Sequence, residues 1–331
     1  MTPPLRQVLV TGASGFLGSH VVRALAARGV AVSAHGRSAD RLGFGSGVRI
    51  CRGDLADLPL LTEGATGCDA VVHCAALSAP WGDPKAFVAA NVAGTVNLLT
   101  AARTAGVRRL VHISSPAVIF DGRDQHQVGD DAPYPASHSS HYARTKQLAE
   151  QLVRAAASSM ETVILRPKAI YGDGDRALVP RLLRAAREGR LPQIGDGINA
   201  VDVTHVDDVV QAIDHALTTT DGVGGTFLVT GGEHVPLWGM IRELLEGVGL
   251  RYPSRRVPLP VALAAAAAME AMATITRREP TLTRYSALIL ARTQTYDISR
   301  ARTLLGYAPR VSAAQGVART IDALRRGGQA A

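Results

Sequence analysis

The chain has 331 residues, of which 47% are hydrophobic and 19% are charged, a balance typical of a folded globular protein. Its net charge is +8, but the basic residues are scattered and only 4% of the residues are aromatic, which argues against a nucleic-acid-binding surface. The three cysteines, Cys51, Cys68 and Cys74, form no CxxC pair, and no zinc-ligand spacing occurs. We therefore predict no metal site, no nucleic-acid partner and a reducing, cytoplasmic location.

The first predicted element is a buried strand at Val8-Leu-Val10, followed by the turn Thr11-Gly-Ala-Ser-Gly-Phe-Leu-Gly18 and then a helix. In such a turn Gly12 makes the tight bend, Gly15 lets backbone N–H groups approach a pyrophosphate, and Gly18 lets the helix pack closely. A second strand about 20 residues further on completes the expected context. The predicted dinucleotide-binding residues are Gly12, Ser14, Gly15, Phe16, Leu17 and Gly18.

Strands and helices alternate through the first half of the chain. Further strands are predicted at 30–34, 48–51, 70–73 and 110–113, and helices at about 18–28 and 85–105. Because right-handed crossovers between parallel strands need a covering helix, this alternation predicts a parallel sheet. The fold class is therefore α/β, a Rossmann-like doubly wound sheet whose ligands bind beyond the carboxyl ends of the strands.

The residues after the second strand indicate which nicotinamide cofactor is preferred. Enzymes that use NAD usually place a carboxylate there, whereas those that use NADP offer an arginine to the 2′-phosphate. The sequence reads His35-Gly-Arg-Ser38, with no acid and with Arg37 in reach. We predict NADP(H) as the preferred cofactor, and NAD(H) if Arg37 is only a solvated loop residue. The residues predicted to flank the adenine and the ribose-pyrophosphate are Asp54, Leu55, Cys74, Ala75 and Ala76.

A tyrosine and a lysine stand four residues apart in His141-Tyr-Ala-Arg-Thr-Lys146, so a helix places both on one face. A tyrosine with its ordinary pKa of about 10 is a poor base at neutral pH. An adjacent ammonium and an oxidised nicotinamide lower that pKa, which would let Tyr142 relay a proton. Ser115, at a strand end, is the candidate to hold the substrate oxygen. The alternative for the Tyr142–Lys146 pair is an ordinary helix contact.

Several motifs follow one another along the chain: Thr11-Gly-Ala-Ser-Gly-Phe-Leu-Gly18, Asp54-Leu55, Asn91-Val-Ala-Gly-Thr95, Ser114-Ser115, Tyr142-x-x-x-Lys146 and Arg166-Pro167. Their order and spacing resemble those of an extended short-chain dehydrogenase/reductase, over nearly the whole chain. Within that superfamily the chain is similar to the 3β-hydroxysteroid dehydrogenase-like branch, which includes sterol dehydrogenases and 2-alkyl-3-oxoalkanoate reductases.

The resemblance implies catalytic roles for four residues. Tyr142 would be the acid/base, and Lys146 would bind the nicotinamide ribose and tune Tyr142. Ser115 would polarise the carbonyl, and Asn91 would support a proton relay. The cofactor site implied by the same motifs also includes Ser114, Tyr142, Lys146 and Pro167.

Two departures from related enzymes narrow the substrate. Dehydratases of the superfamily carry an Asp-Glu pair after the strand hydroxyl, where this chain has Pro116 and Ala117. Sugar-nucleotide epimerases carry an asparagine for the diphosphate, where this chain has Ala169. Both departures favour an apolar ketone or alcohol as the small-molecule substrate.

The second half of the chain is predicted to build a smaller C-terminal substrate-binding lobe. The Rossmann domain would cover residues 1–170 and be completed by about 200–230, while the lobe would consist of 171–199 and 231–325. In the lobe, an amphipathic helix at 178–187 carries arginines that are either solvated or available to a substrate carboxylate.

The most apolar stretch, 261–275, looks too short and too alanine-rich to span a bilayer, so we predict no integral membrane segment. We expect a helix packed on the protein, with peripheral contact to a membrane surface or an acyl chain as the alternative.

Three functions compete. The first is an NAD(P)-dependent oxidoreductase that interconverts a ketone and a secondary alcohol on a steroid-like or alkyl β-keto acid-like substrate. The alternatives are a nucleotide-sugar epimerase and a non-enzymatic NADP-sensing regulator, although such regulators often lose the tyrosine or the lysine. The family often dimerises through two helices, here near 85–105 and 142–157, so we predict a homodimer.

Overall fold

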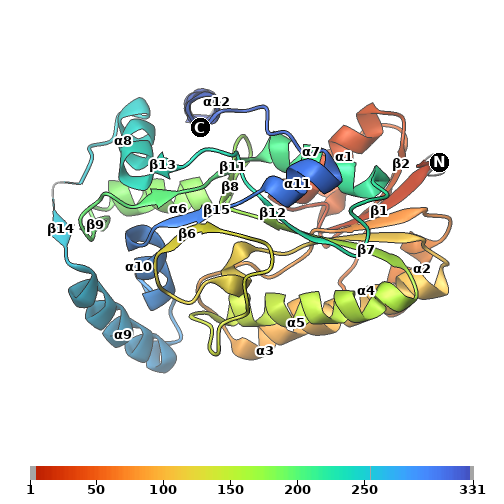
Figure 1. The fold of residues 1–331 in the computed structure, drawn as a ribbon, viewed down its shortest axis with the longest axis horizontal. Coiled ribbons are helices and arrows are strands. Elements are labelled where there is room, and N and C mark those ends of the chain that lie inside the picture. Colours follow the sequence, from red (N-terminus) through yellow and green to blue (C-terminus); the bar gives the residue numbers. More distant parts are fainter. Residues whose placement is uncertain (1–4, 254, 329–331) are drawn as a thin grey trace.

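A seven-stranded parallel sheet runs through the computed structural model, which describes residues 5–253 and 255–328 (Figure 1). The chain moves from β1 outward to β3, returns to β4 beside β1, and then moves to β12 at the other edge. This is the doubly wound arrangement predicted from the sequence. In sheet order the strands are β12 (Thr226–Val229), β7 (Glu161–Pro167), β5 (Arg109–Ile113), β4 (Ala70–His73), β1 (Gln7–Thr11), β2 (Ala31–His35) and β3 (Val48–Cys51).

Helices cover both faces of this sheet because its side chains alternate between two apolar cores. Val8 and Val10 of β1 belong to one core and Leu9 to the other. The first core is covered by α1 (Phe16–Ala27), α7 (Val206–Thr218) and α11 (Ser299–Leu305). The second is covered by α2 (Leu58–Ala65), α4 (Gly94–Thr104) and α5 (His141–Ala155).

The helix predicted at 85–105 is not continuous. It consists of α3 (Pro84–Phe87), a π-helical turn at Val88–Ala93, and α4. π-helical turns inside helices are frequent at functional sites, and this one contains the buried Asn91. The local pattern of apolar residues predicted a helix but not the extra residue in this turn.

A third apolar core lies outside the large sheet, at the left of Figure 1. Trp238 and Leu245 are among its buried residues. Its helices are α6 (Leu178–Arg187), α8 (Leu237–Gly247), α9 (Leu259–Thr276), α10 (Arg284–Ala291) and α12 (Ala313–Gly328). The remaining strands are β6 (Gln125–Val128), β8 (Ile170–Tyr171), β9 (Gln193–Ile194), β10 (Ala200–Val201), β11 (Thr204–His205), β13 (Val235–Pro236), β14 (Arg256–Val257) and β15 (Gln294–Tyr296).

The apolar helix α9 differs from its prediction in two ways. Of its 18 residues only three alanines are buried, while Val261, Met272 and Ile275 are more than half exposed. The helix packs on the protein along one face only, where it contacts α10. It also extends at both ends beyond the predicted 261–275, and by length and composition alone it is long and apolar enough to cross a membrane.

Candidate active site

The glycine-rich turn after β1 brings backbone against backbone. Gly12 adopts φ +70°, and a Cβ there would lie 2.8 Å from the backbone nitrogen of Ala75. A Cβ on Gly18 would lie 2.2 Å from the carbonyl oxygen of Gly12. Because only glycine fits these two positions, α1 starts close against the end of β1.

The N-terminus of α1 has the geometry of an anion site. Gly15 is the N-cap residue, so no side chain bonds to the first turn. The N–H groups of Phe16, Leu17 and Gly18 lack intrahelical partners, and the helix dipole adds positive charge there. These residues therefore fit the pyrophosphate of a dinucleotide.

The other predicted cofactor residues follow the carboxyl ends of β2, β3 and β4. Arg37 is exposed and forms no ion pair with another described residue. Asp54 is also exposed and accepts a hydrogen bond from the Ala56 N–H at 3.0 Å. Sequence reasoning missed Gly36, where a Cβ would lie 3.0 Å from the Ser14 hydroxyl oxygen. The position of this glycine, directly after the second strand, could have indicated from the sequence that the backbone there approaches the glycine-rich turn.

Three hydroxyl groups converge at the start of α5. Ser140 caps the helix by accepting the Ala143 N–H at 3.2 Å, which places Tyr142 in the first turn. The hydroxyls of Ser115 and Ser78 lie close enough to the Tyr142 side chain to influence its pKa. The structure thus brings the predicted Ser115 and Tyr142 together and adds Ser78, for which the sequence offered no motif.

Lys146 lies on the same helix, one turn beyond Tyr142, and turns toward β5. Its ammonium donates to the carbonyl oxygen of Ile113 at 2.5 Å and lies 3.1 Å from Nε2 of His112. Burial lowers the pKa of Lys146 to about 8, against the opposing charge of Glu150. We expected this ammonium to lower the pKa of Tyr142, but burial raises that pKa while the two serine hydroxyls oppose the rise.

The side-chain amide of Asn91 forms three hydrogen bonds close to these residues. Its amide accepts the Leu77 N–H at 2.7 Å and donates to the Leu77 carbonyl at 3.1 Å and to the Thr145 hydroxyl at 3.0 Å. It therefore fastens the loop after β4 to α5. The structure shows no direct bond from Asn91 to Tyr142 or Lys146 within the described residues.

A buried ion pair fixes α5 on the sheet. Arg166 of β7 donates to both carboxylate oxygens of Glu150, at 2.9 and 2.7 Å, and each side chain is at most 1% exposed. Burial would raise the pKa of Glu150, but the Arg166 guanidinium holds it below its usual range. Since Glu150 lies one turn beyond Lys146, this pair fixes the position of the helix face that carries Tyr142 and Lys146.

The C-terminal half contributes polar residues that the sequence interpretation left unassigned. Tyr285 of α10 lies near enough to Tyr142 for the two phenolic charges to interact, and burial raises the pKa of Tyr285. Lys168 follows β7 directly and is only 9% exposed. The sequence could have pointed to Lys168 as a site residue, because it directly follows the motif Arg166-Pro167.

Ala169 stands where epimerases carry asparagine, and its backbone is left-handed with φ +44°. A left-handed backbone is unfavourable for residues that have a Cβ atom. Asparagine and aspartate tolerate it better than alanine does. The chain therefore keeps a small apolar side chain here, packed against the third apolar core, despite the backbone strain.

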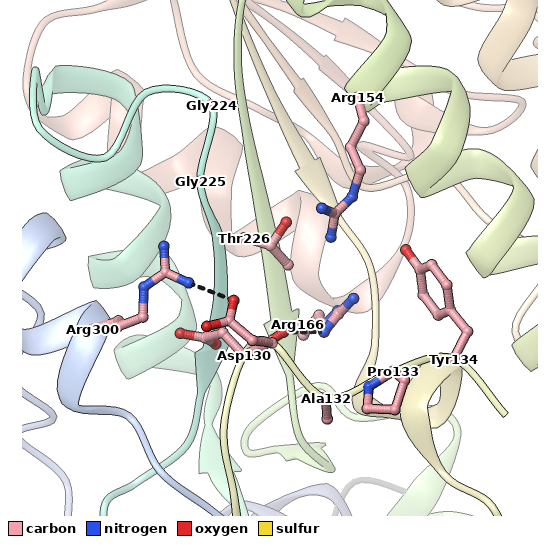
Figure 2. A pocket seen from close by; sticks show the side chains of 11 residues that line it. Asp130, Ala132, Pro133, Tyr134, Arg154, Arg166, Gly224, Gly225, Thr226 and Arg300 are labelled. Carbon is pink, nitrogen blue, oxygen red and sulfur yellow. Dashed lines mark hydrogen bonds and ion pairs between the residues drawn. The ribbon is translucent and has the colours of Figure 1, made fainter.

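A cavity of about 390 Å³ lies beside the edge strand β12, and Arg166 is one of the residues that line it. Figure 2 shows Arg154, Arg166, Arg300 and Tyr134 around it, with Asp130 between Arg300 and Arg166. None of the predicted catalytic or cofactor residues lines it. Within the described residues there is also no group of three or more His, Cys, Asp or Glu side chains that could hold a metal ion.

The fold and the site define a Rossmann-like oxidoreductase that uses a nicotinamide cofactor. The chain belongs to the NAD dependent epimerase/dehydratase family, whose model matches residues 8–230. Its relatives are ketoreductases and 3β-hydroxysteroid dehydrogenases, which confirms the branch predicted from the motifs.

Three relatives illustrate this branch. A 2-alkyl-3-oxoalkanoate reductase from Stenotrophomonas maltophilia is 38% identical, over 95% of this chain and 98% of the relative. The 4-hydroxy-2-methyl-3-oxo-4-farnesyl-3,4-dihydroquinoline-1-oxide ketoreductase from Stigmatella aurantiaca is 36% identical, over 98% and 97%. The decarboxylating sterol-4-alpha-carboxylate 3-dehydrogenase from Homo sapiens is 32% identical, over 97% and 88%.

Solved structures of the family share the fold. MoeE5 in complex with UDP-glucose and NAD has a TM-score of 0.77 at 30% identity, covering 97% of this chain and 99% of that chain. That protein's nicotinamide cofactor agrees with the anion site found at α1.

Proposed function

We propose that this enzyme interconverts a ketone and a secondary alcohol on an apolar substrate. The observation that carries the proposal is the closeness of the Ser115 hydroxyl to Tyr142, with Lys146 one helical turn away on the same helix. When bound, the nicotinamide supplies or accepts the hydride. Tyr142 gives its proton to the carbonyl oxygen during reduction and takes it back during oxidation. Ser115 donates a hydrogen bond to that oxygen as its charge develops.

Supporting residues complete this mechanism. Because burial raises the pKa of Tyr142, its hydroxyl keeps the proton that reduction needs. Lys146 binds the nicotinamide ribose and, with the cofactor in place, tunes Tyr142. Asn91 supports the proton relay through its bond to Thr145.

The proposed substrate is a carboxylic acid with an oxo or hydroxyl group on its β-carbon and with alkyl or sterol substituents. Two of the relatives have names that describe this arrangement, a 2-alkyl-3-oxoalkanoate and a sterol-4-alpha-carboxylate acted on at position 3. Ala169 supports an apolar group, because it offers no amide donor to a sugar diphosphate. The same residue disfavours the epimerase alternative.

We further propose NADP(H) as the preferred cofactor. The support is the exposed and unpaired Arg37 at the end of β2, with no acid in His35-Gly-Arg-Ser38. Arg37→Ala should raise the KM for NADPH about tenfold and leave the KM for NADH unchanged. Equal use of both cofactors by the wild-type enzyme would contradict this part alone.

We also propose a division of the chain into a cofactor domain and a substrate lobe, a dimeric assembly and a cellular compartment. Residues 1–170, completed by 200–230, would hold the cofactor, while 171–199 and 231–325 would bind the substrate. Within the second range α11 is an exception, because it packs on the large sheet and not in the lobe. The exposed apolar side of α9 would be open to acyl chains or a membrane surface. The enzyme would act as a homodimer through α4 and α5. Three free cysteines support a reducing compartment such as the cytoplasm.

The test is nicotinamide absorbance at neutral pH with the purified enzyme, NADPH or NADH, and a panel of substrates. The panel contains a 2-alkyl-3-oxoalkanoate, a 3-oxosteroid and an aryl ketone. We expect turnover of the first or second compound and a loss of at least about 1,000-fold in kcat for Tyr142→Phe. Cofactor binding without turnover of any ketone would contradict the proposal.

A further inference from the structure

Lys168 is a buried cation without an anionic partner at close range. Its side chain is 9% exposed, and its ammonium donates to the side-chain oxygen of Gln294 at 2.5 Å. The same ammonium lies 5.8 Å from the ring centre of Tyr296. No aspartate or glutamate among the described residues forms an ion pair with it. One amide oxygen satisfies only one of the three N–H donors of the ammonium.

The acidic residue whose charge acts on Lys168 is Asp202, and its carboxylate binds other groups. Asp202 accepts a hydrogen bond from the Tyr296 N–H at 3.0 Å and lies 2.6 Å from Nδ1 of His234. Burial lowers the pKa of Lys168 to about 8, and the charge of Asp202 only partly opposes this effect. An isolated buried charge is unfavourable unless an anion joins it. A negative group that approached this ammonium would therefore be stabilised by it.

The position of Lys168 connects it with the reaction. It follows the carboxyl end of β7, and β7 pairs with β5, whose end leads to Ser114-Ser115. Lys168 lies beside the ring of Tyr296, and Tyr285 lies near both Tyr296 and Tyr142. Lys168 is therefore on the same side of the sheet end as Tyr285, which neighbours the proposed catalytic hydroxyl.

The arginines considered from sequence are poorer candidates. Arg181 pairs with Glu279 on the surface, and its side chain is about half exposed. Arg184 is exposed as well. Water solvates both guanidinium groups, so a carboxylate gains little by approaching them.

We propose that Lys168, oriented by Gln294, binds the carboxylate of a β-oxo or β-hydroxy acid substrate. The inference rests on the proposed function and adds the residue that distinguishes such an acid from a neutral ketone. The carboxylate replaces the missing anion beside the ammonium, while the β-oxygen reaches Tyr142 and Ser115.

The experiment compares 2-hexyl-3-hydroxydecanoate with its methyl ester, in the oxidation direction. With Lys168→Met we expect the KM for the acid to rise about 100-fold while kcat and the ester kinetics stay within about twofold. Lys168→Arg should restore part of the lost affinity. The matched control is Arg181→Met, which should change neither substrate. An equal loss for acid and ester would overturn the proposal.

A binding measurement separates this inference from the proposed function. Calorimetry with the Tyr142→Phe enzyme and oxidised cofactor measures affinity for the same acid and ester without turnover. The double variant with Lys168→Met should lose about 100-fold in acid affinity and none in ester affinity. If wild-type enzyme turns over neither compound but this difference remains, the reaction proposal fails and the acid site stands. If the acid binds no better than the ester before Lys168 is changed, the acid site is wrong.

Discussion

Lys168 makes substrate binding depend on pH at the scale of a single residue. Its pKa, lowered to about 8 by burial, means that the ammonium carries its charge below pH 8 and loses it above. A carboxylate binds only the charged form. We predict that acid affinity is constant from pH 6 to 7.5 and falls toward tenfold per pH unit above about 8.

The measurement for this prediction is calorimetric affinity for the acid between pH 6 and 10, with the methyl ester as control. The ester affinity should not follow the same curve. Acid affinity that stays unchanged up to pH 10 would show that another group holds the carboxylate.

Ala169 is a second residue whose conformation has a measurable consequence. Its left-handed φ of +44° is unfavourable for alanine by about 1 kcal/mol, whereas glycine adopts it freely. We predict that Ala169→Gly raises the free energy of unfolding by about 0.5 kcal/mol. This net value is smaller than the relieved strain because glycine also increases the conformational entropy of the unfolded chain. Ala264→Gly, in the exposed part of α9, should instead lower it by about 1 kcal/mol.

Both variants are compared by urea denaturation monitored by circular dichroism. The opposite signs are the informative result, because both substitutions remove the same methyl group. A loss of stability at both positions would mean that contacts of the Ala169 methyl outweigh its backbone strain.

At the scale of elements, the position of α5 depends on the Arg166–Glu150 pair. Arg166→Met leaves Glu150 buried without its partner, so we predict a loss of about 3–5 kcal/mol in the free energy of unfolding. Arg154 approaches the same carboxylate from the surface at 3.8 Å, and Arg154→Met should cost less than about 1 kcal/mol. Thermal and urea unfolding of the two variants measure the difference.

The same ion pair gives this effect a pH dependence. The pKa of Glu150 is below its ordinary value in the folded chain, so its stabilisation is complete above the unfolded pKa, about 4.3. It is lost as the pH falls through the folded pKa. Equal costs for Arg166→Met and Arg154→Met at pH 7 would refute the role of the buried pair.

At the scale of the whole molecule, α4 and α5 form the expected contact between two copies. The two helices lie along one side of the sheet (Figure 1), and Val96 on α4 is 42% exposed. Two such pairs would build a four-helix bundle that covers this apolar surface. We predict a dimer for the wild-type chain and a monomer for Val96→Arg, whereas Ile198→Arg, on an exposed loop of the C-terminal lobe, stays dimeric.

Light scattering coupled to size-exclusion chromatography distinguishes these states. A wild-type monomer at about 10 μM protein would contradict the dimer. A Val96→Arg variant that remains dimeric would place the interface on another surface.

The sequence predicted those parts of the site that depend on neighbours within a few residues. The φ of +70° at Gly12 and the approach of Gly18 to the Gly12 carbonyl are local, so the glycine spacing was sufficient to predict the turn. The approach of Ala75 to Gly12 is a tertiary contact that the spacing did not show. The interval between Tyr142 and Lys146 placed both on α5 for the same reason. Helix periodicity could not show that Lys146 turns away toward Ile113, because the strand that attracts it is remote in sequence.

What the sequence by itself determined is therefore the alternation of strands and helices, the doubly wound sheet and the residues at its strand ends. These follow from short-range sterics and apolar periodicity. Only the tertiary structure decided that Lys168 meets Gln294, 126 residues away, that Ser78 joins Tyr142, and that α9 stays exposed. The physical reason is that burial, and with it the cost of an unpaired charge, is a property of the packed molecule and not of any local stretch.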